Sequence, residues 1–179
     1  NISVRMCMWV MGIVAVGFNV VVFFLRFGGK QHSVQTHLIL NLSISDCLMG
    51  MSMLLLAVFD VYYANYFPSY SDKWRHSGFC NIVGVLSILS SEASVFFITL
   101  ISIDRCQGAT SPFGSYRLRS TSVRICSALI WFVSIALSVI PVLMTQSYPE
   151  VFQLSEVCVG IPLVMRPIGQ PTASVIPID

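Results

Sequence analysis

Four long runs of apolar residues, separated by short polar stretches, dominate this chain. Each run approaches or exceeds the roughly 20 residues that a helix needs to cross a hydrocarbon core of about 30 Å. The pattern predicts membrane-spanning helices at residues 6–25, 38–58, 79–103 and 125–144. Because the links between the runs are short, we expect consecutive helices to be antiparallel neighbours. The fold class predicted is therefore an all-α membrane protein.

The composition agrees with a surface that faces lipid. The chain is 55% hydrophobic and 10% charged, with a mean hydropathy of +0.79, whereas soluble domains contain about 25% charged residues. A net charge of +2 gives no reason to expect a nucleic-acid partner. No metal-ligand cluster, nucleophile–base pair or phosphate-binding loop stands out, so we expect no enzymatic activity.

Basic residues predict the orientation, since Lys and Arg gather at the cytoplasmic ends of spanning helices. The first and third links, with the helix ends beside them, contain the basic residues Arg26, Lys30, Arg105, Arg117, Arg119 and Arg124. Asp104 is the acidic residue on this side. The other side holds Arg5, Lys73, Arg75 and Arg166 together with Asp60, Asp72, Glu150, Glu156 and Asp179. We therefore expect both chain ends to be extracellular, and residues 146–179 to form an extracellular loop.

Two cysteines and one asparagine on the predicted outer side are candidates for covalent chemistry. Cys80 opens the third span and Cys158 follows the fourth, so the oxidising compartment permits a bridge between them. Asn1 begins the glycosylation sequon Asn1-Ile2-Ser3, a pattern that is also common by chance. A second match at Asn41 is rejected because it lies within a predicted span.

Three polar residues lie at similar depths inside the predicted membrane. Counted from the cytoplasmic helix ends, Asn19, Asp46 and Ser94 lie roughly 10, 12 and 16 Å deep. They can meet in one cluster, where an ionised Asp46 would need a cation or several hydrogen-bond donors. Interhelical hydrogen bonding without a ligand is an equally good interpretation. Glu92 lies deeper and points in a different direction from Ser94.

Taken singly, several other features are unremarkable. Asp104-Arg105 can simply mark the end of a helix, and Pro112-Phe113 can be an ordinary turn. Trp131 and Pro141 can provide packing and a kink in the fourth span.

Taken in order and spacing, these features resemble the first four helices of a rhodopsin-like G-protein-coupled receptor. The motifs that carry the resemblance are Asn19, Leu42-Ser43-Ile44-Ser45-Asp46 (the LxxxD motif), Cys80, Asp104-Arg105-Cys106 (the DRY box), Pro112-Phe113, Trp131, Pro141 and Cys158. Two departures are visible: Phe18 precedes Asn19 where the family usually has Gly, and Cys106 replaces the aromatic residue of the DRY box.

The resemblance implies a role for each motif. It implies a Cys80–Cys158 disulfide and a sodium-binding polar pocket formed by Asn19, Asp46 and Ser94. It also implies that Asp104 holds Arg105 in the inactive state, and that Arg105, Pro112 and Phe113 couple to a heterotrimeric G protein. Ligand binding outside would then shift a two-state helix bundle.

Shorter stretches narrow the resemblance to the leucine-rich-repeat receptors. Ser90–Val95 and Leu100–Arg105 look like the third helix of that subfamily, and Asp46–Gly50 with Phe59–Tyr63 looks closest to its relaxin-type branch. The resemblance implies a leucine-rich-repeat ectodomain before Asn1 and three further helices after the chain. The expected protein is a plasma-membrane receptor for a peptide or protein hormone.

A different class of protein remains as an alternative. A self-contained four-span structural or transport protein would use Asp46 and Glu92 as intramembrane ion or proton groups. Three further apolar spans in the native reading frame would favour the receptor. The sequence does not identify the ligand or the G-protein subtype.

Overall fold

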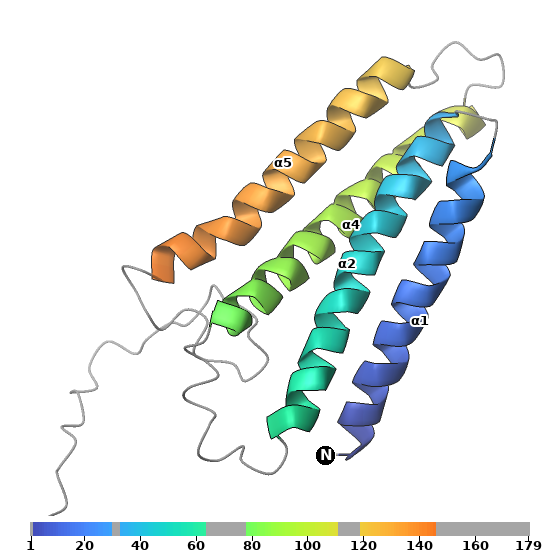
Figure 1. The fold of residues 1–179 in the computed structure, drawn as a ribbon. Coiled ribbons are helices and arrows are strands. Elements are labelled where there is room, and N and C mark those ends of the chain that lie inside the picture. The colour runs from blue at the N-terminus through green and yellow to red at the C-terminus, as the bar shows by residue number, and fades with distance from the viewer. Residues whose placement is uncertain (1, 30–32, 64–77, 111–118, 146–179) are drawn as a thin grey trace, which may run out of the picture.

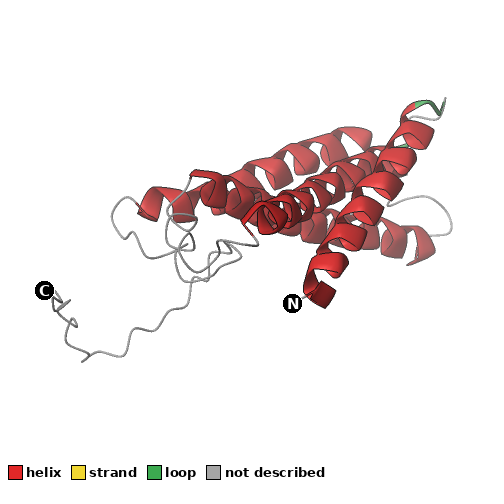
Figure 2. Cartoon of the chain, turned by 60° about the horizontal axis from the view of Figure 1, so that its bottom comes forward, coloured by secondary structure: helices red, strands yellow, loops and turns green. Residues whose placement is uncertain are grey.

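The computed structural model describes residues 2–29, 33–63, 78–110 and 119–145, and all of the regular structure in these segments is helical (Figure 2). The helices are α1 (Ile2–Phe27), α2 (Val34–Tyr63), α4 (Gly78–Thr110) and α5 (Ser120–Thr145). Each of the four predicted spans lies inside one of these helices. All four are long and apolar enough to cross a membrane, so the predicted fold class is confirmed.

The helices alternate in direction and form a bundle in chain order (Figure 1). α1 packs on α2, α2 packs on α4, and α5 packs mainly on α4 with a smaller contact to α2. The end where α1 and α4 finish and α2 and α5 begin is called the Arg105 end below. The opposite end is called the Cys80 end.

The sequence explains where the helices stop and start at the Arg105 end. Gly28 and Gly29 follow α1, where their backbone N–H groups donate to the carbonyls of Phe24 and Arg26 at 3.0 and 3.4 Å. Ser33 caps α2, since its Oγ accepts a hydrogen bond from the backbone N–H of Thr36 at 3.2 Å. The link between the two helices is therefore short, and they lie antiparallel.

Two glycines allow α1 and α2 to approach closely. A Cβ atom at Gly50 would lie 2.8 Å from Cγ2 and 3.0 Å from the backbone N of Val16, and one at Gly12 would lie 2.8 Å from the Leu54 side chain. Small residues at such contacts are typical of helix pairs in membranes, where dispersion contacts drive association.

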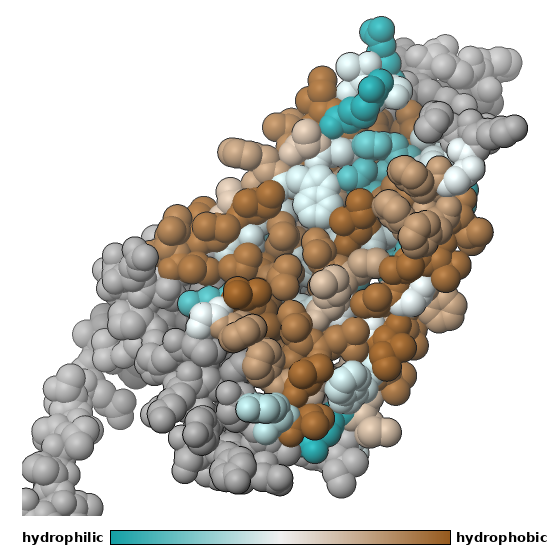
Figure 3. All heavy atoms as spheres, in the orientation of Figure 1, coloured by the Kyte–Doolittle hydropathy of each residue, from teal (hydrophilic) through white to brown (hydrophobic). Residues whose placement is uncertain are grey.

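The most buried apolar cluster joins α2, α4 and α5. Leu38, Ala93, Phe97 and Val123 are almost completely inaccessible, and Trp131 packs against them. The outer surface is also apolar: Phe18, Leu25 and Phe132 are 69%, 72% and 71% exposed. Hydrophobic residues cover much of the face seen in Figure 3, with hydrophilic ones at the ends. Such a surface fits a multi-pass membrane protein, whose lipid-facing side chains need no burial in protein.

Candidate functional site

A carboxylate and a hydroxyl meet between the middle parts of α2 and α4. Ser94 Oγ donates a hydrogen bond to Asp46 Oδ1 at 2.6 Å, and it also lies 3.0 Å from Ser45 Oγ. The Ser45 hydroxyl donates to the carbonyl of Leu42 at 2.8 Å. The contact joins two helices that the sequence separates by 48 residues.

The oxygens of this cluster fit a small hard cation. Carboxylate and hydroxyl oxygens are the ligands that such ions prefer, and the Asp46 carboxylate can supply one negative charge. No group of three or more His, Cys, Asp and Glu residues that could hold a metal ion occurs within the described ranges. One carboxylate among hydroxyls suits a monovalent ion such as sodium, and Asp46, Ser94 and Ser45 are the residues that would hold it.

Asn19, the third residue of the predicted cluster, makes a different hydrogen bond. Its Nδ2 donates to the carbonyl of Ala15 at 2.9 Å, within α1. The α2 side chain that bonds to α1 near this level is Cys47, whose Sγ donates to the carbonyl of Val16 at 4.0 Å. The structure thus brings Asp46 and Ser94 together and shows no hydrogen bond between Asn19 and either of them.

A second polar network ties α2 to α5. Trp131 Nε1 donates to Asn41 Oδ1 at 2.9 Å, and Asn41 Nδ2 donates to the carbonyl of His37 at 2.8 Å. The ring of Trp131 also packs on Phe97, with ring centroids 5.9 Å apart. Sequence reasoning missed Asn41 because it was considered only as a glycosylation match. The available signal was an amide side chain inside a span, which needs a hydrogen-bonding partner there.

Serines and a methionine make a further contact between α2 and α4. The fully buried Ser90 donates to the carbonyl of Ser87 at 3.1 Å and lies 3.5 Å from Met49 Sδ. Ser52 donates to the carbonyl of Met49 at 2.7 Å. The nearby Glu92 is half-buried and makes no hydrogen bond or ion pair with another described residue.

The residues predicted for coupling lie at the Arg105 end as far as the structure describes them. Asp104 is half-buried and Arg105 is exposed, close to the end of α4. Within the described segments these two residues form no ion pair, and the one ion pair found there joins Arg5 to Asp60 at the Cys80 end. Pro112 and Phe113 lie outside the described residues.

The predicted covalent sites are only partly described. Cys80 is completely buried at the start of α4. The free cysteines of the described segments are Cys7, Cys47, Cys106 and Cys126. Cys158, the loop 146–179 and the sequon residue Asn1 lie outside the described residues.

Comparison with known proteins gives a consistent family match. The model of the 7 transmembrane receptor (rhodopsin family) matches residues 18–164. The G-protein coupled receptor GRL101 of Lymnaea stagnalis is 35% identical over 165 residues, which cover 90% of this chain and 14% of that protein.

Two hormone receptors show weaker similarity. Relaxin receptor 2 of Homo sapiens is 27% identical over 142 residues, 79% of this chain and 19% of the receptor. The follicle-stimulating hormone receptor of Felis catus is 24% identical over 149 residues, 82% of this chain and 21% of the receptor. The chain therefore spans about one seventh to one fifth of the length of these relatives.

Proposed function

Because the chain belongs to the rhodopsin family of seven-transmembrane receptors, we propose that it contributes the first four helices of a hormone receptor that activates a heterotrimeric G protein. The family consists of receptors rather than enzymes, and it favours this function over a self-contained four-span transporter. The similarity to relaxin and follicle-stimulating hormone receptors supports a peptide or protein hormone as the ligand.

The proposal extends to segments outside the chain. Since the chain matches only a small share of each relative, there is room in such a receptor for a leucine-rich-repeat ectodomain before Asn1 and three helices after Asp179. The excess of Lys and Arg near the Arg105 end supports a cytoplasmic location for that end, and it favours an extracellular location for both chain ends of a plasma-membrane protein.

The observation that carries the proposal is the hydrogen bond from Ser94 to Asp46. It connects the middle parts of α2 and α4, and Asp46 is partly buried there, where a carboxylate inside the membrane is costly unless its charge is compensated. A sodium ion at this place would supply that compensation. Ser94 donates a hydrogen bond to Asp46 in this structure. A change in the charge of Asp46 would therefore alter how α2 and α4 pack.

Coupling to the G protein is assigned to the Arg105 end. The exposed Arg105 can make charge-assisted hydrogen bonds with a partner. Phe113, eight residues later, can act as an apolar anchor in a pocket of the partner, with Pro112 beside it. In the inactive receptor Asp104 would hold Arg105, in an ion pair that the described segments do not contain.

Substitutions in the full-length receptor, expressed at the cell surface, test this assignment. Arg105→Ala and Phe113→Ala should each reduce nucleotide exchange on a purified G protein and leave surface expression unchanged. Arg26→Ala removes an exposed cation from the end of α1 and serves as the control. Cys106→Tyr restores the usual aromatic residue and should be tolerated. Normal exchange with both Arg105→Ala and Phe113→Ala would overturn the assignment.

A further inference from the structure

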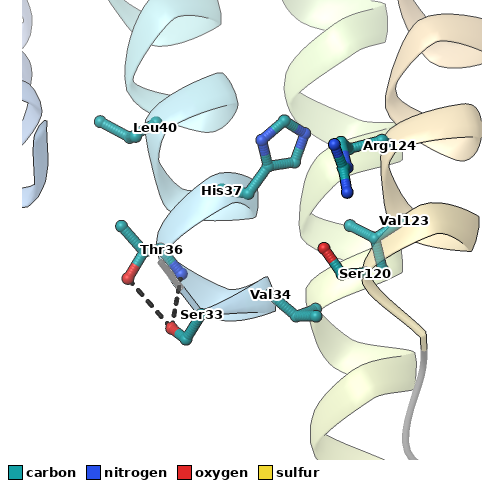
Figure 4. A pocket seen from close by; sticks show the side chains of 8 residues that line it. All are labelled: Ser33, Val34, Thr36, His37, Leu40, Ser120, Val123 and Arg124. Atoms are coloured by element: carbon teal, nitrogen blue, oxygen red, sulfur yellow. Dashed lines mark hydrogen bonds between the residues drawn. The ribbon is translucent and has the colours of Figure 1, made fainter. Parts of the chain in front are cut away.

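A basic pocket opens at the Arg105 end, between the first turns of α2 and α5. Its volume is about 290 Å³, and it is lined by polar side chains over an apolar floor that includes Val123 (Figure 4). The polar lining residues are Ser33, Thr36 and His37 from the α2 side and Ser120 and Arg124 from α5. None of the described side chains that line it is acidic, so the pocket is suited to an anion.

The hydrogen-bond network determines which nitrogen of His37 carries its proton. The indole N–H of Trp131 can only donate, so the Asn41 atom that it contacts must be the amide oxygen. The amide nitrogen of Asn41 then lies 3.3 Å from His37 Nε2. Because an amide nitrogen only donates, Nε2 must accept, and the neutral ring carries its proton on Nδ1.

The pocket therefore presents hydrogen-bond donors of several kinds. Arg124 contributes a guanidinium group, and the serines and threonine contribute their hydroxyls, while the His37 ring also lines the pocket. In Figure 4 the His37 ring and the Arg124 side chain face each other across the space between α2 and α5. Two helices also begin here, and their N-terminal dipoles add to the positive potential.

We propose that this pocket binds the phosphate group of an anionic membrane lipid. Basic pockets between transmembrane helices are a known way to hold lipid phosphates, and this pocket lies at the level where α2 and α5 enter the membrane. The proposal does not depend on the receptor's hormone or on G-protein coupling.

Size and surroundings favour a lipid over a free phosphate. Pockets that enclose whole drug-sized molecules measure about 300–1,000 Å³, so about 290 Å³ accommodates a headgroup and leaves the acyl chains outside. Further along α5 from Arg124, Leu129 and Phe132 are 57% and 71% exposed. These apolar side chains give the acyl chains of a lipid a surface to lie along.

Lipid retention on the full-length protein tests the proposal. The protein is reconstituted in phosphatidylcholine nanodiscs with or without a phosphatidylinositol phosphate, and bound lipid is counted by native mass spectrometry. Loss of one charge-assisted contact in Arg124→Gln should weaken retention about tenfold. Arg124→Lys keeps the charge and should retain most of the binding. The control is Arg119→Gln, since Arg119 is exposed and does not line the pocket.

A second measurement, the melting temperature, distinguishes loss of lipid binding from misfolding of a variant. A bound lipid stabilises the folded state, so phosphatidylinositol phosphate should raise the melting temperature of the wild type and of Arg119→Gln more than that of Arg124→Gln. Equal retention by Arg124→Gln, or an equal loss in Arg119→Gln, would overturn the proposal. So would complete displacement of the lipid by soluble inositol phosphate or inorganic phosphate, which would identify a site for the free anion. Labelling of the pocket by a photoreactive sterol in place of the phospholipid would also overturn it.

Discussion

The indole Nε1 of Trp131 donates a hydrogen bond of 2.9 Å to Oδ1 of Asn41 and thereby ties α5 to α2. α5 otherwise packs mainly on α4 and has only a small contact with α2. In an apolar medium a directional bond of this kind restricts how α5 can rotate. It also fixes the orientation of the Asn41 amide beside His37.

Trp131→Phe should destabilise the full-length receptor. The ring still packs on Phe97, but Asn41 Oδ1 loses its donor. Interhelical hydrogen bonds in membrane proteins average about 0.6 kcal/mol and reach about 1.7 kcal/mol, so we expect a loss of about 1 kcal/mol. The measurement is thermal unfolding in detergent, with Phe132→Leu at a 71% exposed position as the control. Additive effects of Trp131→Phe and Asn41→Leu in a double-mutant cycle would argue against the bond.

The four helices were predictable because apolar length alone determines which segments can cross a bilayer. Their ends were not, since each predicted span was closed near the first charged or polar residues. α4 continues past Arg105 to Thr110. Backbone hydrogen bonds extend a helix beyond the hydrocarbon core, and long basic side chains reach the interface from there.

The contacts of the candidate site were only partly predictable. Equal depth placed Asp46 and Ser94 at one level, and the structure joins them. Depth does not determine how a helix is rotated about its axis, and Asn19 bonds within α1 instead. Rotation depends on close packing, such as that of Gly50 on Val16, which the hydrophobic pattern does not encode.

Gly50→Ala should weaken the packing of α1 on α2. Its new Cβ would lie 2.8 Å from Val16 Cγ2 and 3.0 Å from the Val16 backbone N, so one of the helices must shift. Overpacking of this kind costs about 1–3 kcal/mol. Gly17→Ala is the matched control, because a Cβ there meets no atom within 4 Å and alanine is the better helix former. The prediction fails if the two variants unfold at the same temperature in detergent.

The ion pair between Arg5 and Asp60 should contribute little to stability. The two side chains are 36% and 32% exposed, and pairs this accessible are worth about 0–1 kcal/mol. Arg5→Gln and Asp60→Asn should therefore each shift thermal unfolding only slightly, and raised salt should reduce even that effect. A coupling energy well above about 1 kcal/mol in a double-mutant cycle would show that this pair does more than join two helix ends.

We predict a disulfide between Cys80 and Cys158 in the surface-expressed receptor. Cys80 is buried at the start of α4 and is not among the free thiols of the described segments. Closing so long a loop typically stabilises a protein by about 2–4 kcal/mol, so Cys80→Ser should lower surface expression. Cys7→Ser, at an exposed position near the same end, should not. Mass spectrometry that finds both Cys80 and Cys158 alkylated without reduction would rule the bridge out.

The last prediction separates the charge of Asp46 from its hydrogen bond. In Asp46→Asn the side chain keeps its shape, and Ser94 can still donate to Oδ1, but the negative charge that would attract sodium is lost. Ser94→Ala keeps the charge and removes the donor. If a sodium ion sits here, Asp46→Asn should abolish the sodium dependence of basal G-protein activation, and Ser94→Ala should reduce it.

Ser43→Ala is the control for this pair, because Ser43 is buried on the same helix three residues away and makes no described hydrogen bond with Asp46. If the cluster only holds α2 and α4 together, the order should differ. Ser94→Ala would then lower the melting temperature more than Asp46→Asn, and sodium would act equally on the wild type and all three variants. An unchanged sodium response in Asp46→Asn would remove the cation site and leave Asp46 with a packing role.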